Sequence, residues 1–183
     1  PALPVSFAAR AILAASAERT IDAQYYFYHD DLVGRLLTHL LLEAADRGVK
    51  VRILVDDLRF RRRTHTVASL CRHPNVEVRL FNPLPRQQLK YLGFLADFSR
   101  ANRRMHNKSF TVDNQITVIG GRNIADEYFG AREDAKFSDL DVIGVGPVVQ
   151  DVSTMFDTFW NHETAIPVPA FVDIPDDVSA ELE

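Results

Sequence analysis

The sequence lacks the features that would set it apart from ordinary globular proteins. Its 183 residues include one cysteine, Cys71, so no disulfide can form within the chain and cysteine usage does not indicate a redox compartment. No apolar run approaches the roughly 18 to 20 residues of a membrane span, and no signal-peptide pattern is present. The net charge of -4 argues against a protein that coats nucleic acid. These absences favour a single domain that is soluble as given.

The sequence does contain an alternation of helix and strand patterns. Helical spacing covers residues 5–18, 32–48, 66–71, 87–101 and 147–160, and strand patterns cover residues 21–28, 49–55, 76–81, 105–112, 115–119 and 140–145. Successive strand-helix-strand units predict an α/β fold with one mixed, largely parallel sheet flanked by helices. The segment after Asn161 is proline-containing and ends in acidic residues, so we expect it to be irregular.

The stretch RRMHNKSFTVDN at residues 103–114 carries the first candidate site residues. His106 and Lys108 are two positions apart on a strand pattern, so their side chains are predicted to share one face and to meet one ligand. Asp113 is an odd number of positions from both and falls at the predicted turn. By the pleat alone, Asp113 should bond backbone or a neighbouring basic side chain.

Two glycines and an amide follow the second strand of this predicted hairpin. Gly120 and Gly121 permit close approach of backbone to a ligand, and Asn123 offers a neutral amide donor. An imidazole, an ammonium and an amide that converge on one point suit a phosphodiester, without a metal. Three arginines lie just before the histidine and favour an anionic substrate. They are Arg100, Arg103 and Arg104.

These residues fit the pattern H-x-K-x4-D followed by G-G-x-N, and the chain therefore resembles the phospholipase D superfamily. The segments around the pattern are similar to the bacterial cardiolipin-synthase-like, or transphosphatidylase, branch, and the similarity covers roughly residues 5–168. It implies a phospholipase D-like sandwich, with a catalytic half-domain at residues 1–168. Residues 169–183 would then form an irregular tail or a linker.

The resemblance also implies a role for each motif residue. His106 would be the nucleophile that forms a phosphohistidine, and Lys108 and Asn123 would grip the phosphate. Asp139 is the best match to the acid that orients the nucleophile, with Asp141 in reserve. The motif places Asp113 in the catalytic set as well, and the substrate contacts are completed by Gly120, Gly121 and Arg104. No cofactor and no metal are implied.

One feature of the resembled family is missing, because its active sites use two copies of the motif and this sequence holds one. A second HxKxxxxD half is therefore expected as a partner, either from the same polypeptide or from a second copy in a homodimer. The chain begins at Pro1 without methionine, and this favours the first half of a longer two-motif enzyme.

Three functions remain open at this point. The first is phosphatidyl transfer or hydrolysis on a phospholipid similar to phosphatidylglycerol, in a protein peripheral to a bacterial inner membrane. The second is a homodimeric, single-motif nuclease, which the acidic net charge makes the weaker reading, and the third is a non-catalytic half-domain. Residues 89–104 are apolar and basic and could touch a membrane surface, although an ordinary packed helix explains them equally well.

Other polar and aromatic clusters have ordinary structural explanations. The aromatic run at residues 25–28 is expected to pack in the core first and to contact substrate second. Three clusters could bind a metal or line a cleft, but each has a simpler explanation. His65, Cys71 and His73 are better explained as surface polar residues, Asp56 and Asp57 as loop caps, and His29, Asp30 and Asp31 as a helix cap.

Overall fold

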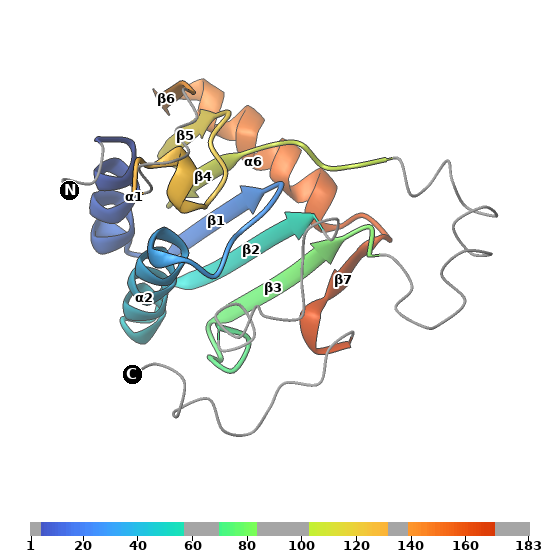
Figure 1. The fold of residues 1–183 in the computed structure, drawn as a ribbon. Coiled ribbons are helices and arrows are strands. Elements are labelled where there is room, and N and C mark those ends of the chain that lie inside the picture. Colours follow the sequence, from blue (N-terminus) through green and yellow to red (C-terminus); the bar gives the residue numbers. More distant parts are fainter. Residues whose placement is uncertain (1–4, 57–69, 84–102, 132–138, 171–183) are drawn as a thin grey trace.

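The computed structural model describes residues 5–56, 70–83, 103–131 and 139–170, and these residues form one layered α/β unit (Figure 1). The helices are α1 (Val5–Ser16), α2 (Leu32–Asp46) and α6 (Pro147–Trp160), with short 3-10 turns η2 (Asp126–Tyr128) and η3 (Val168–Ala170). The strands are β1 (Thr20–Tyr25), β2 (Lys50–Asp56), β3 (Val76–Phe81), β4 (Ser109–Val112), β5 (Ile116–Gly120), β6 (Asp141–Val145) and β7 (Ala165–Pro167).

The strands form a single seven-stranded sheet in the order β6-β5-β4-β1-β2-β3-β7. The pairs β1–β2 and β2–β3 are parallel, while the other four neighbouring pairs are antiparallel. The predicted mixed sheet is confirmed, but its largely parallel character is wrong outside β1, β2 and β3. The reason is that the β4–β5 hairpin, β6 and β7 all join the sheet by reversing direction.

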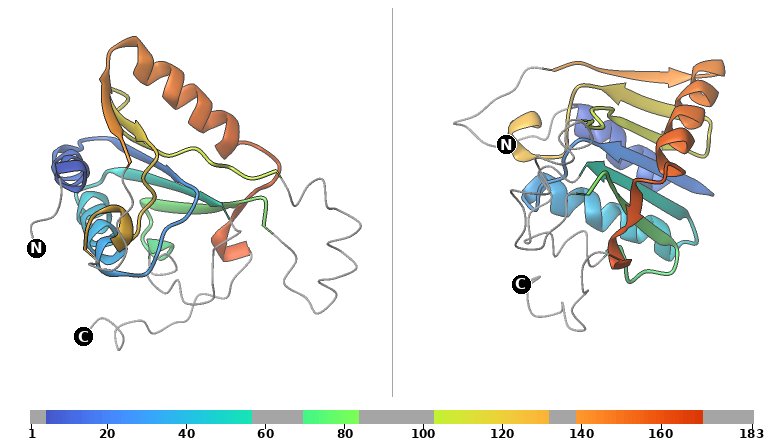
Figure 2. Two further views of the ribbon diagram at one scale, coloured as in Figure 1. Left: turned by 45° about the horizontal axis from the view of Figure 1, so that its top comes forward. Right: turned by 90° about the vertical axis from the view of Figure 1, so that its right-hand side faces the viewer.

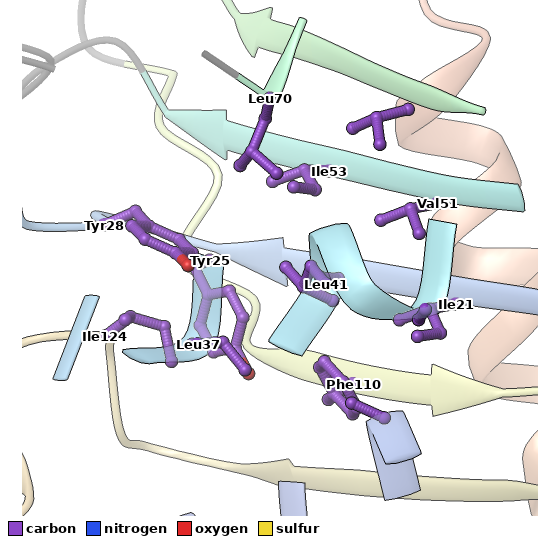
Figure 3. Packing of buried hydrophobic residues seen from close by; sticks show 14 of the residues in the cluster. Ile21, Tyr25, Tyr28, Leu37, Leu41, Val51, Ile53, Leu70, Phe110 and Ile124 are labelled. Atoms are coloured by element: carbon purple, nitrogen blue, oxygen red, sulfur yellow. The ribbon is translucent and has the colours of Figure 1, made fainter. Parts of the chain in front are cut away.

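Helices cover both faces of this sheet (Figure 2). α1 and α2 lie side by side on one face, and α6 crosses the other face over the β4 to β6 side. Apolar side chains of β1, β2, α2 and β4 meet between the sheet and the helices (Figure 3). Ile21, Tyr25, Leu37, Ile53 and Phe110 are all fully buried there. This core fixes the strand ends that carry the site.

The end of the described chain is more regular than the sequence predicts. The segment after Asn161 was expected to be irregular, but β7 pairs antiparallel with β3 and η3 follows it. Pro167 can occupy this position because β7 is an edge strand, where a missing N–H is tolerated. The predicted boundary at residue 168 therefore falls within η3.

Some predicted elements lie outside the described residues. These include the helical spacing at residues 87–101 and most of the short helix at residues 66–71. Within the described residues, no helix combines the length and the apolar character needed to cross a membrane.

Candidate active site

The candidate site lies at one end of the sheet, where strands of opposite direction bring distant segments together. β1, β2 and β3 end there. Because β4 runs antiparallel to β1 and β5 runs antiparallel to β4, β4 begins at this end and β5 finishes there. β6 starts beside the end of β5, with Asp141 opposite Gly120. The segments before β4, after β5 and before β6 therefore converge.

His106 and Lys108 meet at this end of the sheet. Lys108 Nζ lies 3.0 Å from His106 Nδ1 and donates to the His106 carbonyl oxygen at 2.5 Å. The imidazole is exposed, whereas Lys108 is only 7% exposed. The predicted meeting of the two side chains is observed, but the predicted strand start at residue 105 is wrong, because β4 begins at Ser109 and residues 103–108 have no ladder partner.

The electrostatics of this pair follow from burial and from one carboxylate. Burial lowers the pKa of Lys108, and the negative charge of Asp139 partly opposes this effect. A lysine ammonium has no lone pair, so while Lys108 is charged it must donate to His106 Nδ1. A neutral imidazole in that contact carries its own proton on Nε2. Nε2 can act as a nucleophile only after Lys108 releases Nδ1.

Tyr26 is the aromatic neighbour of the pair. Its ring centroid lies 5.0 Å from that of His106, and Lys108 Nζ lies 5.6 Å from the Tyr26 ring centroid. The sequence assigned the aromatic run first to the core, and this holds for the buried Tyr25 and Tyr28. Tyr26 is half-buried and belongs to the site wall instead. Because successive side chains of a strand point to opposite faces, the alternation could have shown that Tyr25 and Tyr26 have different surroundings.

Asn123 is buried beside the site, and its amide is held by two contacts. Its Oδ1 accepts a hydrogen bond from the backbone N–H of Phe27 at 3.2 Å, and its Nδ2 lies 3.4 Å from the Tyr128 hydroxyl. The oxygen is thus committed to backbone, which leaves the amide N–H₂ as the group that can face a ligand. This orientation is compatible with the donor role expected from the sequence.

Gly120 and Gly121 make room for protein atoms of the β6 start. A Cβ on Gly121 would stand 2.1 to 2.4 Å from the carboxylate atoms of Asp139, and one on Gly120 would stand 2.3 Å from the Leu140 carbonyl oxygen. The sequence predicted that a ligand would approach the backbone closely at these glycines. The close approach observed is to Asp139 and Leu140, so the glycines fix where the Asp139 carboxylate can lie.

Asp141, the reserve candidate for the orienting acid, is engaged elsewhere. Its Oδ2 accepts a 2.7 Å bond from Arg10 Nη1 and lies 3.6 Å from Arg122 Nη1. Arg10 is 1% exposed and also donates to the Tyr25 hydroxyl. Asp141 therefore anchors β6 to α1, whereas the charge of Asp139 acts on Lys108.

Asp113 does not join the cluster, and its place in the catalytic set needs correction. It lies in the turn at the other end of β4, where its carboxylate accepts hydrogen bonds from three consecutive backbone N–H groups. These belong to Glu18, Arg19 and Thr20, at 2.9, 2.8 and 2.8 Å. The backbone role that the pleat predicted is the one observed.

Arg104, expected to contact substrate, is instead bonded to protein. Its Nη1 donates to the buried carboxylate of Asp56 at 3.0 Å and to the Asn82 carbonyl oxygen at 3.2 Å. Asp56 also accepts the Met105 N–H at 2.9 Å. The sequence suggested loop capping for Asp56, but only the fold reveals that the capped segment is the one that carries His106. Arg100 and Asp57 lie outside the described residues.

A second polar cluster brings together three side chains that could bind a metal. His29, Asp31 and Glu127 place their ligand atoms within 4.8 Å of one another. Asp31, however, accepts the N–H groups of Gly34 at 3.0 Å and Asp126 at 2.9 Å. It is the N-cap of α2, as predicted, and both of its oxygens serve backbone. The geometry is that of a helix cap.

The histidine and cysteine near β3 also have local roles. His73 Nε2 lies 3.1 Å from Asp46 Oδ1, and the Asn75 N–H donates to His73 Nδ1 at 3.1 Å. Burial raises the pKa of the Cys71 thiol to about 11, so this thiol is protonated at neutral pH. His65, the third residue of that cluster, lies outside the described residues.

A mixed sheet that gathers a histidine–lysine pair, an asparagine and an aspartate at one end defines a phospholipase D-like domain. The chain belongs to this family, because the family model described as the cardiolipin synthase, PLD-like domain matches residues 10–160. Cardiolipin synthase C of Escherichia coli (strain K12) is 51% identical over 176 residues, which are 96% of this chain and 37% of that relative. The chain thus spans little more than a third of its relative's length.

Solved structures share the fold at low sequence identity. NucT from Helicobacter pylori has a TM-score of 0.62 at 16% identity and covers 88% of this chain and 90% of its own. Phosphatidylserine synthase of Haemophilus influenzae Rd KW20 has a TM-score of 0.64 at 13% identity, over 89% of this chain and 36% of its own. The same fold thus fills nearly all of one neighbour and about a third of the other.

Proposed function

We propose that this chain supplies one half of an active site that transfers or hydrolyses the phosphatidyl group of a phospholipid through a phosphohistidine. The observation that carries the proposal is the exposed imidazole of His106 with the buried ammonium of Lys108 at 3.0 Å. The similarity to cardiolipin synthase C supports a phospholipid as the substrate class.

The chemistry begins with the release of Lys108 from His106 Nδ1 by the substrate phosphate. A phosphoryl oxygen carries negative charge, whereas Nδ1 of a neutral imidazole does not. The phosphoryl oxygen is therefore the stronger acceptor for the Lys108 ammonium. Exchange with water then moves the ring proton from Nε2 to Nδ1, where it can donate a hydrogen bond to the carboxylate of Asp139, whose charge acts on Lys108. His106 Nε2 is left with its lone pair, and the tautomer needed for attack is reached when substrate is bound.

In the first displacement, Nε2 forms a bond to phosphorus and the bond from phosphorus to the leaving alcohol oxygen breaks. Lys108 and the Asn123 amide stabilise the growing charge on the non-bridging oxygens. The leaving oxygen needs a proton, and its donor would be the histidine of the second half. In the second displacement, water or an acceptor hydroxyl attacks phosphorus, gives up its proton to that same group, and frees His106.

The charge near the cluster supports a lipid over a nucleic acid. Among the described residues, Arg104 is bonded to Asp56 and Arg122 lies within 3.6 Å of Asp141, so both cations face carboxylates. Nucleic-acid binding relies on several cations that contact phosphates. The net charge of -4 adds to this argument.

The direct test is a transfer assay with the intact protein that contains this chain. Vesicles of phosphatidylglycerol, with and without added glycerol, and single-stranded DNA are offered in parallel. We expect lipid products to form with the wild type, to vanish with His106→Asn, and to persist with His39→Asn. His39 is exposed on α2 and serves as the matched control. Cleavage of DNA without any lipid product would overturn the substrate class.

The requirement for a second half has its own test. The 183-residue chain lacks the second acid, and general acid catalysis contributes about 10²- to 10⁴-fold in rate. We expect a strictly monomeric sample of this chain to turn over at least about 10²-fold more slowly than the intact protein. Equal rates per site, with light scattering that shows monomers during the assay, would contradict the half-site arrangement.

A further inference from the structure

The segment that carries the nucleophile is not held by the sheet. Residues 103–108 belong to no strand, and ladder pairing begins only at Ser109. A histidine that must present one nitrogen to phosphorus needs a fixed backbone, since a displacement of about 1 Å can cost roughly 10²-fold in rate. Something other than strand pairing must therefore fix the chain just before His106.

Asp56 supplies two of the contacts that fix this segment. It is the last residue of β2, its side chain is fully buried, and both of its oxygens are bonded to the segment. Oδ2 accepts the Met105 N–H at 2.9 Å, and Oδ1 accepts from Arg104 Nη1 at 3.0 Å. One carboxylate thus holds the backbone of the residue next to His106 and the side chain of the residue before that.

Asn82 adds a second attachment from the end of the neighbouring strand β3. Its Nδ2 donates to the Arg103 carbonyl oxygen at 2.9 Å, and its own carbonyl accepts from Arg104 Nη1 at 3.2 Å. Met105 is fully buried against the cluster that includes Trp160 and Phe156. Residues 103–105 are therefore fixed one after another, and only three residues separate this attachment from β4.

From these contacts we infer that Asp56 is a positioning residue for His106. It holds the Arg104–Met105 backbone so that the imidazole stands against Lys108 and Tyr26 instead of swinging on an unpaired segment. Its bonds to Arg104 and Met105 act on His106 through the chain and not on a reacting atom. The kinetic part of this inference rests on the proposed function, whereas the structural part does not.

The neighbouring strand offers a matched control. Asp22 on β1 is 3% exposed and forms a two-point bond with Arg52, at 2.6 and 2.8 Å. Arg52 continues to Asp157 of α6 at 2.8 Å. Asp22 and Asp56 are thus buried aspartates on adjacent parallel strands, each paired with an arginine, but the arginine bound by Asp22 lies on β2 and not in the His106 segment.

The test compares Asp56→Asn with Asp22→Asn in the 183-residue chain. An asparagine keeps the shape of the side chain but presents an N–H₂ group to the arginine, so each variant weakens one pair. The readout is the ¹⁵N and ¹³C resonances of the His106 ring, assigned with His106→Asn, together with the melting temperature. We expect Asp56→Asn to move the His106 ring resonances and Asp22→Asn to leave them in place at a comparable loss of melting temperature.

A kinetic arm is run on the intact protein. We expect Asp56→Asn to slow phosphohistidine formation in single turnover by about 10- to 100-fold with little change in the half-saturating lipid concentration, and Asp22→Asn to leave the rate within about 2-fold. If no phosphohistidine forms in the wild type, the proposed function fails and the resonance arm alone decides the role of Asp56.

Two outcomes overturn the inference. One is an unchanged His106 ring signal in a folded Asp56→Asn variant, and the other is a shift of equal size in Asp22→Asn. If Asp56→Asn does not fold, Asn82→Gly takes its place, since residue 82 has a positive φ of 49° that glycine accepts and the variant removes the side-chain bond to Arg103. Asn82→Gly should move the same resonances in the same direction by a smaller amount, and unchanged signals would overturn the inference.

Discussion

The two ends of β4 carry residues of one sequence motif and put them to different uses. Before the strand, Lys108 is buried against the exposed imidazole of His106 at the open end of the sheet. After it, Asp113 lies in a tight turn with φ of 53° and binds three backbone N–H groups of the α1–β1 connection. The four residues between Lys108 and Asp113 are β4 itself, Ser109–Val112.

This difference teaches how the spacing of the motif should be interpreted. The interval x4 is the length of a short strand, so the motif describes a hairpin arm with chemistry at one end and an anchor at the other. Thr20 pairs at the start of β1, and its N–H bond to Asp113 ties the hairpin to that strand. We therefore expect changes at the Lys108 end to affect rate and changes at the Asp113 end to affect stability.

The largest effect is expected at Lys108. Lys108→Met removes the ammonium but keeps an unbranched side chain of similar length, so the hairpin should stay folded. Loss of one preorganised donor to a developing oxyanion costs about 10²- to 10³-fold. Single-turnover formation of phosphohistidine in the intact protein should fall by that factor with an unchanged melting temperature. A rate within a few fold of wild type would remove Lys108 from the chemistry.

The second effect separates Asp139 from Asp141 by pH dependence. Burial lowers the pKa of Lys108 and Asp139 partly restores it, so Asp139→Asn should lower this pKa further. In the proposed mechanism Lys108 must be charged to hold the phosphate. The fall in rate at high pH should therefore begin at lower pH in Asp139→Asn.

Asp141→Asn is the control for this comparison. It breaks a buried pair with Arg10, which costs of order 3 kcal/mol in the free energy of unfolding, but it should leave the basic limb of the pH–rate profile where it is. An equal displacement of the basic limb in both variants would contradict the assignment of Asp139.

A smaller effect of the same kind is expected from Gly121→Ala. The new methyl would stand 2.1 Å from a carboxylate oxygen of Asp139, so the side chain must move away while the backbone need not. The basic limb of the pH–rate profile should shift to lower pH, as in Asp139→Asn, but by a smaller amount. Gly130→Ala, which adds a methyl in open space at a φ of 63°, controls for backbone strain and should destabilise the fold without moving the limb.

The smallest effect on rate is expected at Asp113. Asp113→Ala should lower the free energy of unfolding by about 1 to 3 kcal/mol, because three N–H groups lose a charged acceptor, and should leave phosphohistidine formation within about 2-fold. A loss of rate larger than the loss of stability explains would place Asp113 in the chemistry after all.

The pH dependence of this stability difference has a definite sign. Burial raises the pKa of Asp113, but the three backbone hydrogen bonds and Arg19 outweigh it, so the folded pKa lies below the ordinary 3.8. The stabilisation is therefore fully present above 3.8 and is lost as the pH falls through the folded pKa. Urea unfolding of wild type and Asp113→Ala should differ most at neutral pH and converge in acid.

Local patterns predicted most of the elements. The predicted bounds of β3 and α6 agree with the observed ones, Val76–Phe81 and Pro147–Trp160, because their spacing and the proline at the first turn of α6 are local signals. The β4–β5 hairpin was predicted from its turn, but the antiparallel pairing of β4 with β1, of β6 with β5 and of β7 with β3 was not, since it depends on partners far along the chain.

The same division applies to the site. Two-residue spacing predicted that His106 and Lys108 meet, and the turn position predicted that Asp113 bonds backbone. The contact of Gly121 with Asp139 depends on the β5–β6 register, and the bonds of Asp56 to Arg104 and Met105 link residues 48 and 49 positions apart. No local pattern carries such pairings, so Arg104 was assigned to the substrate.

The most direct measurement is a rapid-quench experiment on the intact protein with phosphatidylglycerol vesicles, followed by mass mapping of the trapped, acid-labile and base-stable phosphoryl adduct. The account predicts an adduct on the imidazole of His106 that is absent from His106→Asn and unaffected by metal chelators. An adduct on another residue, or turnover that chelators abolish and added metal restores, would contradict it.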